Sequence, residues 1–250
     1  MRYFKNRPSG DGRAEACLGL AKLGRPKGRP YDSILSAVIL VSALAATAIS
    51  APQEVSSPAK LTFRKVLPGS APEFTEITVD STGSGTYDGR QLADPPSPRT
   101  LKLSSVTTRK LFALAHAMDD FKSIDLESHK KVANLGRKTF TYDAGGQKYS
   151  AEFNYSLRRE AQELADVFEK IASVEEHIKA LEFEEKYDHL GLPRELLQIQ
   201  IDLDNKALAD PELMVPTLRS IARDSHFLHL AQARAQNILQ RLGEGDDGLR

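Results

Sequence analysis

Residues 138–155 read Lys-Thr-Phe-Thr-Tyr-Asp-Ala-Gly-Gly-Gln-Lys-Tyr-Ser-Ala-Glu-Phe-Asn-Tyr, and this stretch decides the fold. Apolar and polar side chains alternate on both sides of Asp-Ala-Gly-Gly, which is the period of a strand with one buried face. A short glycine-containing turn between two such segments is typical of a β-hairpin. The sequence therefore predicts two antiparallel strands here, at 138–142 and 148–155.

The segments before this hairpin predict further strands and one helix. Alternation over residues 60–67, 74–79, 84–87 and 101–105 indicates four strands. A helix capped by Ser104 or Ser105 is then indicated by apolar residues at helical spacing: Leu111, Leu114, Ala115, Met118 and Phe121. Residues 60–156 are therefore predicted to form an α+β domain, a small antiparallel sheet with one covering helix.

The pattern changes to a helical one from residue 157. Apolar residues recur every three or four positions, which predicts one long amphipathic helix: Leu157, Ala161, Leu164, Phe168, Ile171, Ile178 and Leu181. Gly191 and Pro193 are expected to end this segment.

Three shorter helices are predicted beyond it. One covers residues 195–207, one follows Pro211 with a kink or a late start at Pro216, and one covers residues 227–242. Residues 157–243 thus form the predicted helical region, and 244–250 a frayed tail. We interpret the last two helices as a hairpin packed on the preceding helices, in preference to a single repeat unit of the HEAT type.

Residues 34–49 form an uncharged apolar run behind the basic residues Lys27 and Arg29. The end of this run, at residues 46–50, offers small residues at the positions that a signal peptidase reads, as a cleaved secretory signal requires. We therefore expect a leader and signal over 1–50, a tether over 51–59, and a mature protein in the periplasm or outside the cell. An anchor in the cytoplasmic membrane, which needs about 20 apolar residues, and a buried core helix are the alternatives. The polar leader over 1–30 raises the hypothesis of a downstream start codon.

Charge and cysteine content exclude several function classes. Residues 1–50 carry eight Lys or Arg against three Asp or Glu, and the rest of the chain carries 26 against 31. A net negative mature protein is not expected to bind nucleic acid. The only cysteine, Cys17, precedes the signal. The mature protein is therefore expected to lack disulfides, thiol chemistry and cysteine-bound metal.

Histidine and acidic clusters were weighed as metal or catalytic sites. His226 and His229 have a chelating spacing, and His116 precedes Asp119 and Asp120 by three and four positions. An acidic group ends the long helix: Glu182, Glu184, Glu185, Asp188 and His189. Each of these clusters is explained better as part of a helix surface or a helix terminus than as a metal or catalytic site. We predict no catalytic residue, no metal site and no cofactor.

Aromatic side chains crowd the hairpin and continue into the long helix. Alternation places most of them on a core face, and we hypothesise that the others form an exposed interaction surface, for which we select Tyr142, Tyr149, Phe153, Tyr155 and Phe168. The tripeptide Asn154-Tyr155-Ser156 also matches the N-glycosylation sequon of secreted proteins.

Residues 61–89 resemble the opening of a family of small exported bacterial domains of unknown function. The resemblance is carried by Val66, Pro68-Gly69, residues 74–80, Gly83 and residues 86–89. It implies two or three strands followed by a helix and a strand pair, which fits residues 99–155. It implies no activity and no functional residue.

These observations predict an exported, non-catalytic module that binds a protein partner or a second copy of itself through its long striped helix. A hydrolase-type enzyme whose site is assembled from distant residues is one alternative. A structural protein anchored in the cell envelope by residues 34–49 is the other.

Overall fold

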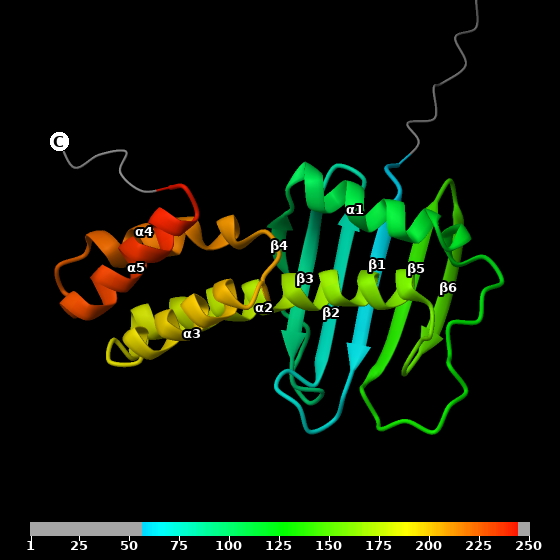
Figure 1. Cartoon of the computed structure of the whole chain (residues 1–250), viewed down its shortest axis with the longest axis horizontal. Coiled ribbons are helices and arrows are strands. Elements are labelled where there is room, and N and C mark those ends of the chain that lie inside the picture. Colours follow the sequence, from blue (N-terminus) through cyan, green and yellow to red (C-terminus); the bar gives the residue numbers. More distant parts are fainter. Residues whose placement is uncertain (1–56, 245–250) are drawn as a thin grey trace, which may run out of the picture. The chain divides into compact units, whose positions relative to one another are not determined.

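A computed structural model describes residues 57–244, so the predicted leader and signal (1–50) lie outside the described residues. The fold is α+β, a six-stranded antiparallel sheet with a long helix and a helical C-terminal region (Figure 1). The strands are β1 (Lys60–Val66), β2 (Phe74–Asp80), β3 (Ser84–Arg90), β4 (Arg99–Lys102), β5 (Arg137–Ala144) and β6 (Gln147–Phe153). The helices are α1 (Ser105–His116), α2 (Arg159–Tyr187), α3 (Leu192–Asp204), α4 (Val215–Arg223) and α5 (His229–Arg241), with short 3-10 helices η1 (Asp119–Phe121) and η2 (Pro211–Met214).

The predicted hairpin is confirmed as β5 and β6, at one edge of a sheet of order β4-β3-β2-β1-β5-β6. Ala144 pairs with Gln147, so Gly145 and Gly146 alone form the turn. Their φ values of 60° and 76° are the left-handed conformations that a two-residue type I′ turn requires at both positions. Glycine adopts them without steric cost, which fixes the register of the hairpin.

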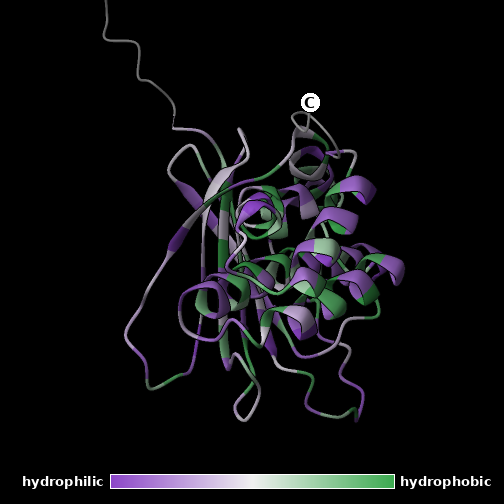
Figure 2. Cartoon of the chain, turned by 90° about the vertical axis from the view of Figure 1, so that its left-hand side faces the viewer, coloured by the Kyte–Doolittle hydropathy of each residue, from purple (hydrophilic) through white to green (hydrophobic). Residues whose placement is uncertain are grey.

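Two helices cover one face of the sheet. The predicted helix after Ser104 is α1, whose first turn is capped by the Ser104 hydroxyl accepting from the Thr107 amide at 3.2 Å. The first half of α2 lies beside α1 on the same face (Figure 1), and all helices lie on this side of the sheet (Figure 2). Six strands span about 25 Å, whereas one helix is about 10 Å wide, so a single helix would leave the apolar face partly exposed.

No described element covers the opposite face of the sheet. Its middle register row carries a hydroxyl on every strand: Thr100, Thr86, Thr78, Thr62, Thr141 and Ser150. The neighbouring rows are largely charged, with ion pairs such as Arg64 to Glu76 at 2.6 Å. An antiparallel sheet with one polar, solvated face is common, and β-branched threonine suits an exposed strand.

The core beneath the helices is built on aromatic side chains. Phe63 stacks on Phe168 of α2 with ring centroids 5.1 Å apart, and Phe140 contacts Phe63, Phe121 and Phe153 at 5.2–5.7 Å. These rings come from β1, β5, β6, η1 and α2. Burial of each ring contributes several kcal/mol, so this cluster holds both helices against the sheet.

A second core lies among the helices beyond the sheet. From Val174 onward, α2 packs its apolar stripe against α3, η2 and α4, and α5 completes this core by packing on α3 and α4. Because α2 contributes to both cores, the sheet and the helical region share one continuous helix of 29 residues. The division between the cores falls within α2, after Ile171, and not at residue 157 where the two predicted regions meet.

Several helix boundaries differ from those expected. α1 ends at His116, whereas apolar spacing predicted a helix through Phe121, because Asp119, Asp120 and Phe121 all have left-handed backbone conformations. This turn allows Met118 and Phe121 to be buried in the first core. Downstream, Pro193 does not end a helix but lies in the first turn of α3, where its missing N–H costs nothing. Pro216 likewise occupies the first turn of α4, so of the two expectations for this proline, a kink or a late helix start, the late start is the one observed.

Candidate functional site

The connection from η1 to β5, residues 122–136, is the longest segment without helix or strand among the described residues. It runs beside β6 and past the start of β5 (Figure 1). Connections of about 15 residues are uncommon within a compact domain and frequently carry function. We refer to residues 122–136 as the long loop.

Buried and hydrogen-bonded groups fix the first part of the long loop. Leu126 is buried in the aromatic core. The carboxylate of Glu127 accepts hydrogen bonds from the Asn154 amide at 2.6 Å and the Ser128 amide at 2.9 Å, and these bonds lower the pKa of Glu127. The Ser128 amide also donates to the Tyr155 carbonyl at 2.8 Å. These hydrogen bonds therefore hold the loop against Asn154 and Tyr155, the two residues directly after β6.

The Asn154 side chain fixes the second part. Its Oδ1 accepts from the Leu135 amide at 2.7 Å, and its Nδ2 donates to the Ala133 carbonyl at 2.9 Å. The Asn154 side chain thus supplies the two hydrogen bonds that the backbone of a neighbouring strand would otherwise make to the loop. Asn154 also belongs to the predicted sequon, but its Oδ1 and Nδ2 are both engaged by the loop backbone. In the folded protein this side chain is therefore not a free glycosylation acceptor.

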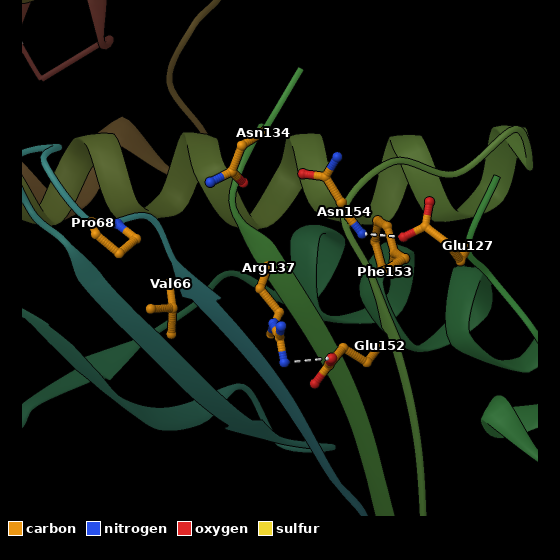
Figure 3. A pocket seen from close by; sticks show the side chains of 8 residues that line it. All are labelled: Val66, Pro68, Glu127, Asn134, Arg137, Glu152, Phe153 and Asn154. Carbon is orange, nitrogen blue, oxygen red and sulfur yellow. Dashed lines mark hydrogen bonds and ion pairs between the residues drawn. The ribbon is translucent and has the colours of Figure 1, made fainter. Parts of the chain in front are cut away.

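A cavity of about 600 Å³ lies between the long loop and the sheet (Figure 3). It is lined by Val66, Pro68, Glu127, Asn134, Arg137, Glu152, Phe153 and Asn154. Its two exposed charges neutralise each other, because Arg137 and Glu152 form an ion pair at 3.1 Å across the hairpin. The volume is in the range of ligand-binding pockets, and the lining mixes polar and apolar groups. The arrangement is suited to receiving a side chain or small group, and its wall contains no Ser, Thr, Cys or Lys.

A second cavity, of about 380 Å³, lies between the β1–β2 turn and α2. His177 on its wall contacts Glu195 through Nδ1 at 2.6 Å and Asp202 through Nε2 at 3.0 Å. Burial opposes the charged imidazolium, but the two carboxylates outweigh it and raise the pKa of His177. With both ring nitrogens engaged, His177 acts as a cationic tie between α2 and α3.

Sequence reasoning missed the site around His177. Its partners lie 18 and 25 positions further on, on another helix. A usable signal existed, since Glu195 and Asp202 are seven residues apart and therefore share one face of α3.

A second group of ionisable side chains joins α2 to β3. The Tyr87 hydroxyl donates to Glu176, and Lys179 donates to the same carboxylate at 3.0 Å and to the Gly89 carbonyl at 2.8 Å. Burial, together with the charge of Glu176, raises the pKa of Tyr87. A Cβ at Gly89 would lie 2.0 Å from the Tyr87 hydroxyl oxygen, so only glycine leaves room for this contact. These groups are all partnered, which is typical of a structural junction.

Glu184, from the predicted acidic group, lies at the end of α2 facing the start of α3. Its Oε2 is buried without a hydrogen-bond partner among the described residues. Burial and the negative charge of Glu195 raise its pKa, while Arg194, 4.0 Å from Oε1, opposes this. An unpartnered buried carboxylate costs stability when it is ionised.

The predicted aromatic surface is largely core. Phe168 is fully buried, and Phe153 and Tyr142 are also buried, so selecting these three as interaction residues was wrong for the folded protein. Their positions on the covered face of β5 and β6 and on the inner face of α2 explain this. Tyr149 and Tyr155 are half-buried, with hydroxyls bonded to Gln147 and Gln162. They stay partly accessible beside the long loop.

The predicted histidine pairs occupy ordinary helix ends. His116 contacts Asp120 at 2.6 Å, and His226 contacts Asp224 at 2.7 Å, while His229 is 3.3 Å from Gln232. Within residues 57–244, no group of three or more potential ligands has the arrangement of a metal site. Of the helices in that range, none combines the length and apolar character needed to cross a bilayer.

Comparison with known proteins adds no relative. No protein-family model matches the chain, and no curated protein is similar to it at a significant level. The resemblance of residues 61–89 to small exported domains therefore stays a prediction.

Proposed function

We propose that the protein is an exported, non-catalytic binding module that contacts a protein partner through the long loop. The observation that carries this proposal is the combination of a fixed backbone with exposed side chains. Asn154 and Glu127 hold the loop through the hydrogen bonds given above, while residues 129–132 stay exposed. A loop that is ordered before binding loses little conformational freedom when a partner docks.

The state of the ionisable groups favours binding over catalysis. In the cavity beside the long loop, Arg137 pairs with Glu152 and Glu127 accepts backbone amides. In the second cavity, His177 pairs with Glu195 and Asp202. A general base needs a free nitrogen or carboxylate within reach of a substrate.

The hydrolase alternative is favoured by one observation, the position of His177 on a cavity wall. It requires one carboxylate to release the imidazole. Loss of ester or peptide hydrolysis in the His177→Gln variant, measured against a panel of chromogenic substrates, would support the alternative.

Export is supported by the basic flank and apolar run of residues 27–49 and by the small residues at 46–50. Cell fractionation tests it. A soluble extracytoplasmic protein that begins near residues 49–51 is expected. Recovery in the membrane fraction at the precursor mass would favour the anchored alternative.

The binding role is tested by affinity capture from the extracytoplasmic fraction of the source organism. The wild type is compared with a variant in which residues 129–132 are replaced by Gly-Ser-Gly-Ser, which keeps the anchors Leu126, Glu127 and Asn154. The control replaces exposed Lys60 and Lys148, at the opposite end of the sheet, by Gln. A partner bound by wild type and control and lost with the loop variant is expected. Equal capture by all three would reject the loop as the binding element.

A further inference from the structure

We propose that the partner presents an acidic protein segment, which docks on a basic surface formed by the long loop and the start of α2. This inference rests on the proposed function and specifies the chemistry of its partner. The surface, called here the basic end, consists of Lys130, Lys131, Arg158 and Arg159, with Val132 and Leu157 between them.

The two lysines of the long loop have no internal counter-charge. Both are exposed, and no carboxylate of residues 57–244 lies within ion-pair distance of either. The nearby acids are already engaged. Asp125 contacts His129 at 2.7 Å, and Glu127 accepts backbone amides. The positive charge of Lys130 and Lys131 is therefore available to a partner.

The connection from β6 to α2 adds two arginines to the same end of the molecule. The hydrogen bond from the Ser128 amide to the Tyr155 carbonyl places Tyr155 beside the loop, and Arg158 and Arg159 follow it by three and four positions at the start of α2. Arg158 and Arg159 are exposed, and neither lies within ion-pair distance of a carboxylate of the described residues, although the charge of Arg159 contributes to lowering the pKa of Glu163 nearby. Arg158 and the two lysines therefore leave positive charge that an acidic ligand can neutralise.

Apolar side chains interrupt the cations. Leu157 is 56% exposed and Val132 is 39% exposed. Exposed apolar groups rimmed by charge are typical of protein-binding surfaces. A segment that alternates acidic and apolar residues complements both features, and the cavity of Figure 3, next to the loop anchors, can receive one of its side chains.

A protein segment fits better than an anionic membrane or a nucleic acid. Outside residues 1–50 the chain carries 26 Lys or Arg against 31 Asp or Glu, so an extended anionic surface is repelled overall. A short segment senses only charges within about one Debye length, roughly 8 Å at physiological salt, and within that range it meets the basic end.

The probe is a fluorescently labelled peptide of alternating Glu and Leu, with a matched peptide in which Gln replaces Glu. Fluorescence anisotropy measures its affinity for the mature protein, for Lys130→Gln with Lys131→Gln, and for Arg158→Gln with Arg159→Gln. The control is Lys60→Gln with Lys148→Gln. We expect the Glu peptide to bind the wild type and the control, more weakly as salt increases, and each basic-end variant to bind it about three- to tenfold more weakly.

Three outcomes overturn the inference: no binding of the Glu peptide, equal binding of the Gln peptide, or unchanged affinity in the basic-end variants. Sedimentation of the protein with phosphatidylglycerol vesicles, lost in the same variants, would assign the surface to a membrane instead. If the loop replacement abolishes partner capture while the peptide result is negative, the binding role stands and only the acidic partner is rejected.

Discussion

The two halves of α2 lie in unlike surroundings. The first half packs Phe168 and its neighbours into the aromatic core under the sheet, where no charge is buried on the helix. The second half buries Glu175 near Arg99 of β4 and Glu184 near the start of α3, and its His177 contacts Glu195 and Asp202 of α3. Burial raises the pKa of Glu175, against the opposing charge of Arg99. The same helix is thus held by packing at one end and by titratable groups at the other, so the two cores should differ in their response to pH.

The largest effect is expected for Phe168→Ala. Removal of a fully buried ring stacked on Phe63 leaves a cavity and should lower the free energy of unfolding by about 3–5 kcal/mol. The loss should be the same at about pH 6 and pH 9, since the aromatic partners of the ring, Phe63 and Phe140, do not titrate. Urea denaturation followed by circular dichroism measures it. A loss under about 1 kcal/mol would show that the aromatic core does not hold α2.

His177→Gln should have the next largest effect, about 1–2 kcal/mol near pH 6, because it leaves Glu195 and Asp202 without their cation. Folding raises the pKa of His177, so its contribution is complete below its ordinary value near 6.5 and is lost as the pH rises through the raised value. The difference between variant and wild type should therefore shrink at high pH. His226→Gln, at an exposed position, is the matched control. A loss of stability that is the same at all pH values would contradict a charged His177 that pairs with Glu195 and Asp202.

Glu184→Gln should stabilise the protein by about 0.5–1 kcal/mol at pH 8, because the ionised, unpartnered carboxylate is costly. The sign follows from its raised pKa: the folded protein favours the protonated acid, and this stability is lost as the pH rises through the folded value. Variant and wild type should converge near pH 4. Thermal unfolding at pH 8 and pH 4 measures the difference in stability between variant and wild type, with the exposed Glu160→Gln substitution as control. Destabilisation at pH 8 would mean that the carboxylate has a partner.

The smallest effect is expected for Tyr187→Ala, at the end of α2. The ring is 66% exposed and contacts the equally exposed ring of Phe183 at 5.2 Å. Its removal should change the free energy of unfolding by less than about 0.5 kcal/mol. A larger loss in urea denaturation would extend the second core to this surface.

The strands and helices followed from sequence where periodicity was strong. The hairpin at residues 138–155 was predicted because its alternation and its glycine turn agree, and Leu164, Phe168 and Ile171 gave the inner face of α2. The predicted ends of helices were less accurate where burial of a side chain in the core outweighed the local spacing of apolar residues. The turn at Asp119 and Asp120 allows Phe121 to be buried, and spacing alone cannot show it.

The candidate site was mostly invisible to sequence reasoning, because its residues meet only in the fold. Asn154 matched a sequon, yet its side chain binds the backbone of residues 133 and 135, some 20 positions earlier. The aromatic residues were selected by composition, and alternation places the larger ones in the core. The charge of Lys130 and Lys131 could not be related to the start of α2 from the sequence, because the hydrogen bond from Ser128 to Tyr155 that joins the two segments forms only in the fold.

Backbone hydrogen exchange of the protein, free and bound to its captured partner, tests the binding role most directly. The account predicts slower exchange on binding in residues 127–136 and 154–159, with no change in α3, α4 and α5. Protection confined to α3–α5, with unchanged exchange in the long loop, would contradict it.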